Sequence, residues 1–332
     1  MVPGVYLDSG IAKVHAVHLS HKGAPMSPTR SVIITGATTG LGREVAKIIA
    51  QDPSTMVVVA CRDAELGTLA VEQLETAGGK AMVLPLDLGD QASVRRFVEL
   101  FRKASLPQLF GIICNAGMQN VAPPKKTIEG YETTFAVNHL GHYCLVRLLL
   151  DDLSQDGRIT FVSSGTHDPK EKTGMPEPHY ENATAAAHDF EPGRTAGLRR
   201  YTTSKLCNIY NAYELSHRLS ASDDARLSSI KVNAIDPGLM PATGLARSWP
   251  APLRWVSRNI LPLLKFVNNN VHTPATSAKR VAALSLGPDA QPGGRYFSNG
   301  KPVPSSDASY EKDKARELWI SSATMISLPV NI

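Results

Sequence analysis

The sequence predicts an α/β protein built on a single doubly wound parallel sheet of about seven strands, with helices on both faces. From residue 31 onward, short runs rich in β-branched residues alternate with helical stretches. These runs are apolar throughout rather than at every second position, which is typical of parallel strands covered on both faces. The chain shows no internal repeat and no interdomain linker, so we expect one domain.

The expected elements follow in order along the chain. Strands are predicted at residues 31–35, 56–61, 81–86, 110–114, 158–163 and 229–235. The domain is expected to span residues 30–325, after an N-terminal extension (1–29) that lacks the apolar core of a signal peptide and is predicted to be poorly ordered.

Two segments interrupt this alternation. Residues 165–200 are rich in Pro, Gly, Ala and His and are predicted to form an inserted loop. Residues 239–276 combine prolines with many large apolar side chains, and they are predicted to be a lid over the substrate.

Composition narrows the class of partner. The chain has 332 residues, of which 42% are hydrophobic and 20% charged, as in soluble globular proteins. Lys and Arg number 35 against 30 acids and form no basic runs, which argues against nucleic acid. No apolar run is long enough for a transmembrane helix. The four cysteines have no metal-binding spacing, so we expect buried, reduced thiols, no metal site and a cytoplasmic protein.

A glycine-rich motif, "TGATTGLG", follows the first predicted strand and opens a helix. Its three glycines permit a tight turn, a close approach of the backbone to a pyrophosphate, and close packing of helix on strand. The helix N-terminus offers free N–H groups to phosphate. The motif therefore predicts a Rossmann dinucleotide site that includes Gly36, Thr38, Thr39, Gly40, Leu41 and Gly42.

The second strand ends in "ACRD". An acid near this point would suit a free ribose 2′-hydroxyl, whereas the guanidinium of Arg62 matches a 2′-phosphate, so NADP(H) is favoured over NAD(H). The alternative is an arginine that pairs with Asp63. At the end of the third strand, Asp87 and Leu88 are predicted to lie beside the adenine.

"YTTSK" places Tyr201 and Lys205 on one face of a predicted helix. Together with "TGATTGLG", "CNAG" (114–117), "VNHLG" (137–141), "VSS" (162–164) and "DPG" (236–238), it stands in the order found in short-chain dehydrogenases/reductases. The chain resembles that family over about residues 31–300. The resemblance implies a catalytic tetrad of Asn138, Ser164, Tyr201 and Lys205.

The resemblance also implies a role for each residue. Tyr201 would protonate the substrate oxygen, with a pKa lowered by Lys205, which would also hold the nicotinamide ribose. Ser164 would hydrogen-bond the substrate oxygen, and Asn138 would anchor a water. The adenosine side would be braced by Asn115, Ala116 and Gly117, and the nicotinamide would lie against Pro237 and Gly238.

Within the family the chain looks like protochlorophyllide reductases and retinol-dehydrogenase-like reductases, through "ACRD", "RLLLDDL", "SKLCN" and "PGLMPATGL". Leu239 stands where the light-driven enzymes carry cysteine, and "VSS" stands where they carry Val-Gly-Ser, which argues against photochemistry. We expect an NADPH-dependent reductase of a carbonyl in a bulky apolar molecule. The alternatives are reduction of a conjugated C=C bond and a non-catalytic NADPH-binding protein.

Several residues are expected to have minor roles. His139 and His142 are predicted to be packing or surface residues rather than ligands, and contact of His167 with substrate is the less favoured of its interpretations. Basic residues interleave with the apolar ones at 247–266. That pattern fits contact with a membrane surface, although a lid over an apolar ligand explains it better. A homodimer is a further expectation.

Overall fold

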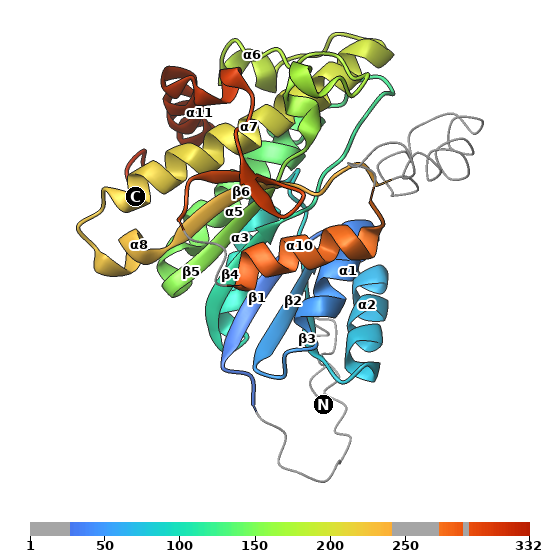
Figure 1. Ribbon diagram of the computed structural model, residues 1–332, viewed down its shortest axis with the longest axis vertical. Coiled ribbons are helices and arrows are strands. Elements are labelled where there is room, and N and C mark those ends of the chain that lie inside the picture. Colours follow the sequence, from blue (N-terminus) through green and yellow to red (C-terminus); the bar gives the residue numbers. More distant parts are fainter. Residues whose placement is uncertain (1–26, 241–271, 288–291) are drawn as a thin grey trace, which may run out of the picture.

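Eight strands form one sheet in the order β3-β2-β1-β4-β5-β6-β7-β8 in this computed structural model (Figure 1). They are β1 (Arg30–Thr35), β2 (Thr55–Cys61), β3 (Lys80–Pro85), β4 (Gln108–Cys114), β5 (Leu153–Val162), β6 (Lys231–Asp236), β7 (Arg295–Ser298) and β8 (Lys301–Val303). Neighbouring strands run parallel except β8, which pairs antiparallel with β7. The predicted fold class is confirmed. The structure describes residues 27–240, 272–287 and 292–332.

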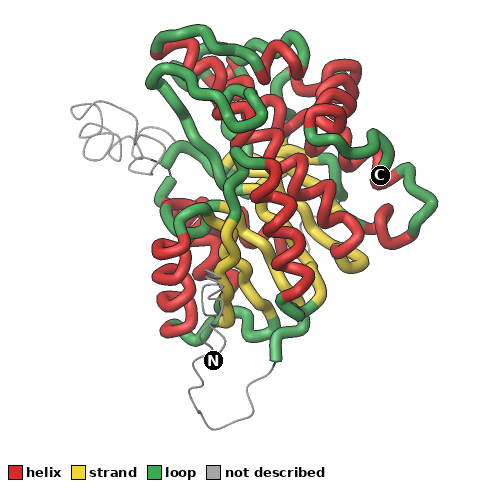
Figure 2. Tube along the Cα trace, turned by 180° about the vertical axis from the view of Figure 1, so that it is seen from behind, coloured by secondary structure: helices red, strands yellow, loops and turns green. Residues whose placement is uncertain are grey.

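Helices cover both faces of the sheet (Figure 1 and Figure 2). One face carries α1 (Gly40–Ile49), α2 (Ala64–Thr76) and α10 (Pro274–Leu286). The other carries α3 (Gln91–Lys103), α5 (Gly141–Leu149), α7 (Arg194–Ser220) and α11 (Lys312–Met325). Alternate residues of a strand point to opposite faces, so Val32 and Ile34 join one apolar cluster while Ile33 joins the other. This is why the strands are apolar throughout.

Shorter helical segments complete the fold. They are α4 (Thr133–Phe135), the π-helix Ala136–Leu140, α6 (Ala183–Ala187), α8 (Ala225–Ser229) and the 3₁₀ segments Leu150–Asp152, Gly165–His167, Pro169–Glu171 and Asp307–Tyr310. All four cysteines are buried and none forms a disulfide. Within the described ranges, every helix is too short or too polar to cross a membrane.

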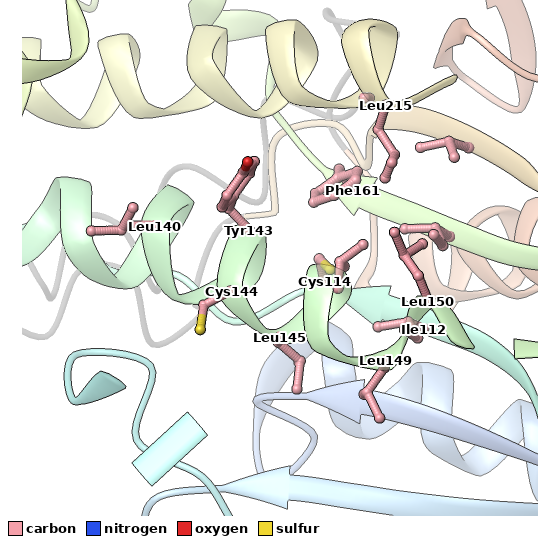
Figure 3. Close-up of a cluster of buried hydrophobic side chains, with 14 of the residues drawn as sticks. Ile112, Cys114, Leu140, Tyr143, Cys144, Leu145, Leu149, Leu150, Phe161 and Leu215 are labelled. Carbon is pink, nitrogen blue, oxygen red and sulfur yellow. The ribbon is translucent and has the colours of Figure 1, made fainter. Parts of the chain in front are cut away.

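The larger core cluster lies between the sheet and α3, α5, α7 and α11. Figure 3 shows part of it, with Ile112 and Cys114 from β4, Phe161 from β5 and Leu215 from α7. Trp319 of α11 is 1% exposed and its ring meets Tyr143 edge-on at 4.9 Å. The C-terminal helix is therefore part of the same core as the central strands.

The stretch 165–200, predicted as a loop, contains two 3₁₀ segments and α6, and its last residues already belong to α7, which begins at Arg194. It is anchored from within, because Tyr180 is buried and its hydroxyl donates to Glu317 of α11 at 2.5 Å. Composition predicted a loop because the stretch is rich in Pro and Gly, and composition does not reveal contacts with distant residues. Most of the predicted lid (241–271), its basic stretch 247–266 and residues 1–26 lie outside the described residues.

Candidate active site

The predicted site residues gather at one edge of the sheet, where the parallel strands end. Gly36 follows β1, Arg62 follows β2, Asn115 follows β4, Ser164 lies just beyond β5, and Pro237 follows β6. The chain order reverses between β1 and β4, and in sheets of this type the crevice outside that point takes ligands.

The glycine-rich loop is held in a shape that side chains would disturb. Gly36 and Gly40 have φ values of 67° and 58°, where residues other than glycine are strained. A Cβ on Gly42 would lie 2.5 Å from the Gly36 carbonyl oxygen and 2.4 Å from Nδ2 of Asn115. Helix α1 begins at Gly40, and the exposed Thr39 before it makes no side-chain cap. The first N–H groups of α1 thus lack a cap from Thr39, as an anion site requires.

Asn115 and Thr35 brace this loop from the neighbouring strand. The Asn115 side chain donates to the Thr35 carbonyl at 2.8 Å. In return, the Thr35 hydroxyl accepts the backbone N–H groups of Asn115 and Ala116, both at 2.9 Å. The residue after them, Gly117, comes within reach of the tetrad, since a Cβ there would be 3.5 Å from Nζ of Lys205.

The residues predicted to contact the adenosine half of the cofactor follow the ends of β2 and β3. Arg62 is exposed, and the carboxylate of Asp63 caps α2 by accepting the Leu66 N–H at 3.0 Å. No Arg62–Asp63 ion pair occurs in the described part of the chain, so the alternative interpretation of Arg62 lacks support. Asp87 accepts the Gly89 N–H at 2.9 Å, which shapes the turn after β3, and Leu88 is buried.

Asn138 lies in the π-helix and is fully buried. Its side chain accepts the Met118 N–H at 2.8 Å and donates to the Met118 carbonyl at 2.9 Å. It also donates to the Ser204 hydroxyl at 2.9 Å, and Ser204 donates to the Tyr201 carbonyl at 2.7 Å. Asn138 therefore joins the loop after β4 to the helix that carries the tyrosine.

The other three tetrad residues converge beside β5. Tyr201 and Lys205 are one turn apart on α7, both are buried, and the Lys205 ammonium lies 5.5 Å from the centroid of the Tyr201 ring. The ammonium donates to the Val162 carbonyl at 3.0 Å. The Ser164 hydroxyl lies close enough to the Tyr201 phenol to lower its pKa.

Burial has the largest effect on the pKa values of both Tyr201 and Lys205. It raises the pKa of Tyr201 above its ordinary value, the nearby Asp236 carboxylate raises it further, and Ser164 opposes both. Burial lowers the pKa of Lys205 to about 8, against an opposing effect of Asp236. The net shift in the pKa of Tyr201 is therefore upward, whereas the sequence predicted a pKa lowered by Lys205. The phenol keeps its proton at neutral pH, as a general acid must.

Asp236 is a site residue that sequence reasoning missed. It is the last residue of β6, is buried, and accepts the Gly238 N–H at 2.9 Å. This bond shapes the turn at Pro237 and Gly238, where Gly238 has a φ of 82°. The Pro237 carbonyl accepts the hydroxyl of Ser277 on α10 at 2.6 Å. The sequence could have indicated Asp236, because an acidic residue at the end of a predicted strand, in the motif "DPG", lies at the edge of the sheet where the site forms.

The two histidines of "VNHLGH" pack in the fold, as predicted. His139 is fully buried and pairs with the Ser322 hydroxyl of α11 at 2.9 Å. His142 lies 3.1 Å from the Asn138 carbonyl through Nδ1 and 2.9 Å from the Thr35 hydroxyl through Nε2. Because burial lowers the pKa of His142 to about 4, the ring is neutral and links Asn138 to the glycine-rich loop.

A cavity of about 610 Å³ lies between the stretch 176–191 and the start of α7. Its lining includes Thr203 and Ser204 but not Tyr201, Lys205 or Ser164. We therefore do not assign it to the reaction. No cluster of three metal-ligating side chains occurs among the described residues.

Comparison with known proteins places this geometry in context. Residues 30–190 match the family described as short chain dehydrogenase. The chain is 32% identical over 320 residues to a protochlorophyllide reductase of Avena sativa, covering 90% of this chain and 99% of that protein. It is 34% identical over 304 residues to the human WW domain-containing oxidoreductase, covering 89% and 67%.

Solved structures share the fold. The angucycline C-6 ketoreductase LanV with bound NADP aligns with a TM-score of 0.59 at 24% identity, covering 82% of this chain and 95% of that one. A blue fluorescent protein from a metagenomic library, in complex with NADPH, aligns with a TM-score of 0.57 at 20% identity, covering 82% and 96%.

Proposed function

Because this chain belongs to the short-chain dehydrogenase/reductase family of oxidoreductases, we propose that it uses NADPH to reduce a carbonyl group in a bulky, largely apolar small molecule. The observation that carries this proposal is the convergence of Ser164, Tyr201 and Lys205 at the carboxyl ends of β5 and β6. The direct test is oxidation of NADPH by the purified protein in the presence of a panel of apolar ketones and aldehydes.

The residues around the sheet edge fit the cofactor. The start of α1 and the glycine-rich loop would take the pyrophosphate, and the exposed Arg62 would pair with the 2′-phosphate. Asp87 and Asn115 would border the adenosine, and Gly238 the nicotinamide. LanV and the metagenomic fluorescent protein, which share this fold, have structures with bound NADP and NADPH, respectively. When bound, NADPH supplies the hydride.

The protein's own part in the reaction is to place and move a proton. The Tyr201 phenol, protonated at neutral pH, donates its proton to the substrate oxygen. Ser164 donates a hydrogen bond to the same oxygen and stabilises its developing charge. The phenolate left behind is stabilised by the ammonium of Lys205, which the Val162 carbonyl holds beside the ring.

The apolar nature of the substrate rests on the sequence of 239–276, most of which lies outside the described residues. Two tryptophans and many leucines there offer more apolar surface than a polar ligand would use. We propose that this segment covers the substrate. The homodimer and the cytoplasmic location stay predictions from the sequence.

The similarity to protochlorophyllide reductases favours a second candidate, reduction of a conjugated C=C bond. An α,β-unsaturated ketone separates the candidates, because carbonyl reduction yields an allylic alcohol and C=C reduction yields a saturated ketone. If NADPH binds but no member of the panel turns over, in the dark or in light, the non-catalytic alternative gains support.

Replacing Arg62 with alanine is expected to reduce the preference for NADPH over NADH by about tenfold or more. A charge-assisted hydrogen bond to phosphate contributes about 1.5–3 kcal/mol, and only NADPH carries that phosphate. The dissociation constants of both cofactors measure the effect. Arg96→Ala, at another exposed arginine, serves as control. Equal binding of the two cofactors by the wild-type protein would show that Arg62 has been assigned the wrong role.

The pH dependence of kcat/KM is expected to show a fall in activity as pH rises through about 8, the pKa of Lys205 in the free protein. The ammonium is present below this pH and is lost above it. Asp236 raises the pKa of Lys205, so Asp236→Asn should move the fall to lower pH. If kcat/KM of this variant fell at the same pH as in the wild type, a group other than Lys205 would be responsible for the fall.

A further inference from the structure

His167 is held between the catalytic-serine loop and the C-terminal part of the chain. The side chain is buried, with 1% of its surface exposed. Nδ1 lies 2.7 Å from the carbonyl oxygen of Ser164, and Nε2 lies 3.0 Å from the backbone nitrogen of Ser306. Both ring nitrogens are therefore engaged by the backbone, so neither faces a substrate.

These two bonds define the state of the ring. A carbonyl oxygen can only accept, so Nδ1 carries the hydrogen and donates it to Ser164. A backbone N–H can only donate, so Nε2 must offer its lone pair to Ser306. Only the neutral Nδ1–H tautomer satisfies both partners, and burial favours it by lowering the pKa of His167.

The partner segment is itself rigid. The Ser306 carbonyl accepts the N–H of Ser309 at 2.9 Å and its hydroxyl at 2.6 Å, within the 3₁₀ turn Asp307–Tyr310. The ring of Tyr296 on β7 meets His167 edge-on at 4.9 Å. The charged groups that act on His167 are the carboxylates of Asp168 and Asp236, and both favour the protonated form.

We propose that His167 is a positioning residue, which directs the Ser164 hydroxyl toward Tyr201 by tying the Ser164 backbone to the amide of Ser306. The backbone amide of Ser306 thereby supports the active site from outside it, and residues 305–310 do not contact the reacting atoms. The inference rests on the proposed function, because it assigns Ser164 a role in catalysis.

Ser306→Pro removes the donor of this bond to His167, and the φ of Ser306, −58°, is close to the value that proline requires. The proline Cδ takes the place of the lost hydrogen, so it also pushes the His167 ring away from Ser306. Ser306→Ala is the matched control, because it removes only the hydroxyl and keeps the amide. The Ser306 hydroxyl makes no hydrogen bond in the described structure, so its loss should be neutral.

The test uses NADPH and a carbonyl substrate that the wild-type protein reduces. Under these conditions Ser306→Pro is expected to lower kcat about tenfold or more, because a misplaced Ser164 hydroxyl slows the chemical step. The dissociation constant of NADPH should not change, and Ser306→Ala should match the wild type. The wild-type kcat should also fall in acid below the ordinary histidine pKa, because imidazolium has no lone pair for Ser306. That acid limb should be absent in Ser306→Pro.

A second variant and a second readout keep the proposal testable. If the proline variant does not fold, His167→Phe retains the edge-on ring while removing both bonds, and it should show the same loss of kcat and of the acid limb. Amide hydrogen exchange of residues 163–168 should be faster in either variant than in Ser306→Ala, with exchange in α1 unchanged. This exchange is measurable even if no substrate is turned over, so it separates the inference from the proposed function. The proposal would be overturned if both variants had the kcat of the wild type, kept the fall of kcat in acid, and showed the same amide exchange as the wild type.

Discussion

Replacing Tyr201 with phenylalanine is expected to lower turnover by about 10²-fold or more while leaving folding and NADPH binding intact. The change keeps the buried ring and removes only the hydroxyl, whose pKa the neighbouring Ser164 lowers. Single-turnover rates with saturating NADPH measure the chemical step, and NADPH fluorescence titration measures binding.

Tyr131→Phe is the matched control for this experiment. Its hydroxyl donates to the Met325 carbonyl at 3.2 Å, away from the strand ends, so its removal should leave turnover near the wild-type value. Turnover of Tyr201→Phe within a few-fold of wild type would contradict the proposed mechanism. It would favour a proton source other than this tyrosine.

Gly42→Ala is expected to destabilise the fold and to abolish most NADPH binding. The new methyl would stand 2.4 Å from Nδ2 of Asn115 and 2.5 Å from the Gly36 carbonyl oxygen, both far inside contact distance. Overpacking of this kind costs about 1–3 kcal/mol in stability. To remove this steric overlap, either the Asn115 side chain or the glycine-rich loop must move. Both border the proposed pyrophosphate site. Denaturant unfolding and the dissociation constant of NADPH measure the two effects.

Lys47→Ala in the same helix is the control, since its exposed ion pair with Glu44 contributes little. The decisive comparison is between binding and stability in Gly42→Ala. If NADPH affinity stays at the wild-type level while the protein is destabilised, the loop is structural and the cofactor binds elsewhere. If neither quantity changes, the packing of Asn115 against the loop is not as tight as its geometry indicates.

Local pattern was sufficient for the architecture and for most of the candidate site. The six predicted strands all occur, with boundaries that differ by a few residues, because strands covered on both faces are mostly apolar rather than apolar at every second position. The glycines of 36–42 were recognisable for the same kind of reason: positive φ values at Gly36 and Gly40 exclude most other residues. The i, i+4 spacing of Tyr201 and Lys205 likewise follows from helix geometry alone.

Other features depend on contacts between segments far apart in the chain, and no local pattern encodes them. His167 meets an amide 139 residues away, and Tyr180 meets a glutamate 137 residues away, which turns an expected loop into packed structure. The protonation of Tyr201 was misjudged because sequence revealed the lysine one turn on but not the depth of burial or the Asp236 carboxylate. Spacing along the chain determines which groups share a face. Desolvation and long-range hydrogen bonds depend on everything that packs around them, and these decide what each group can do.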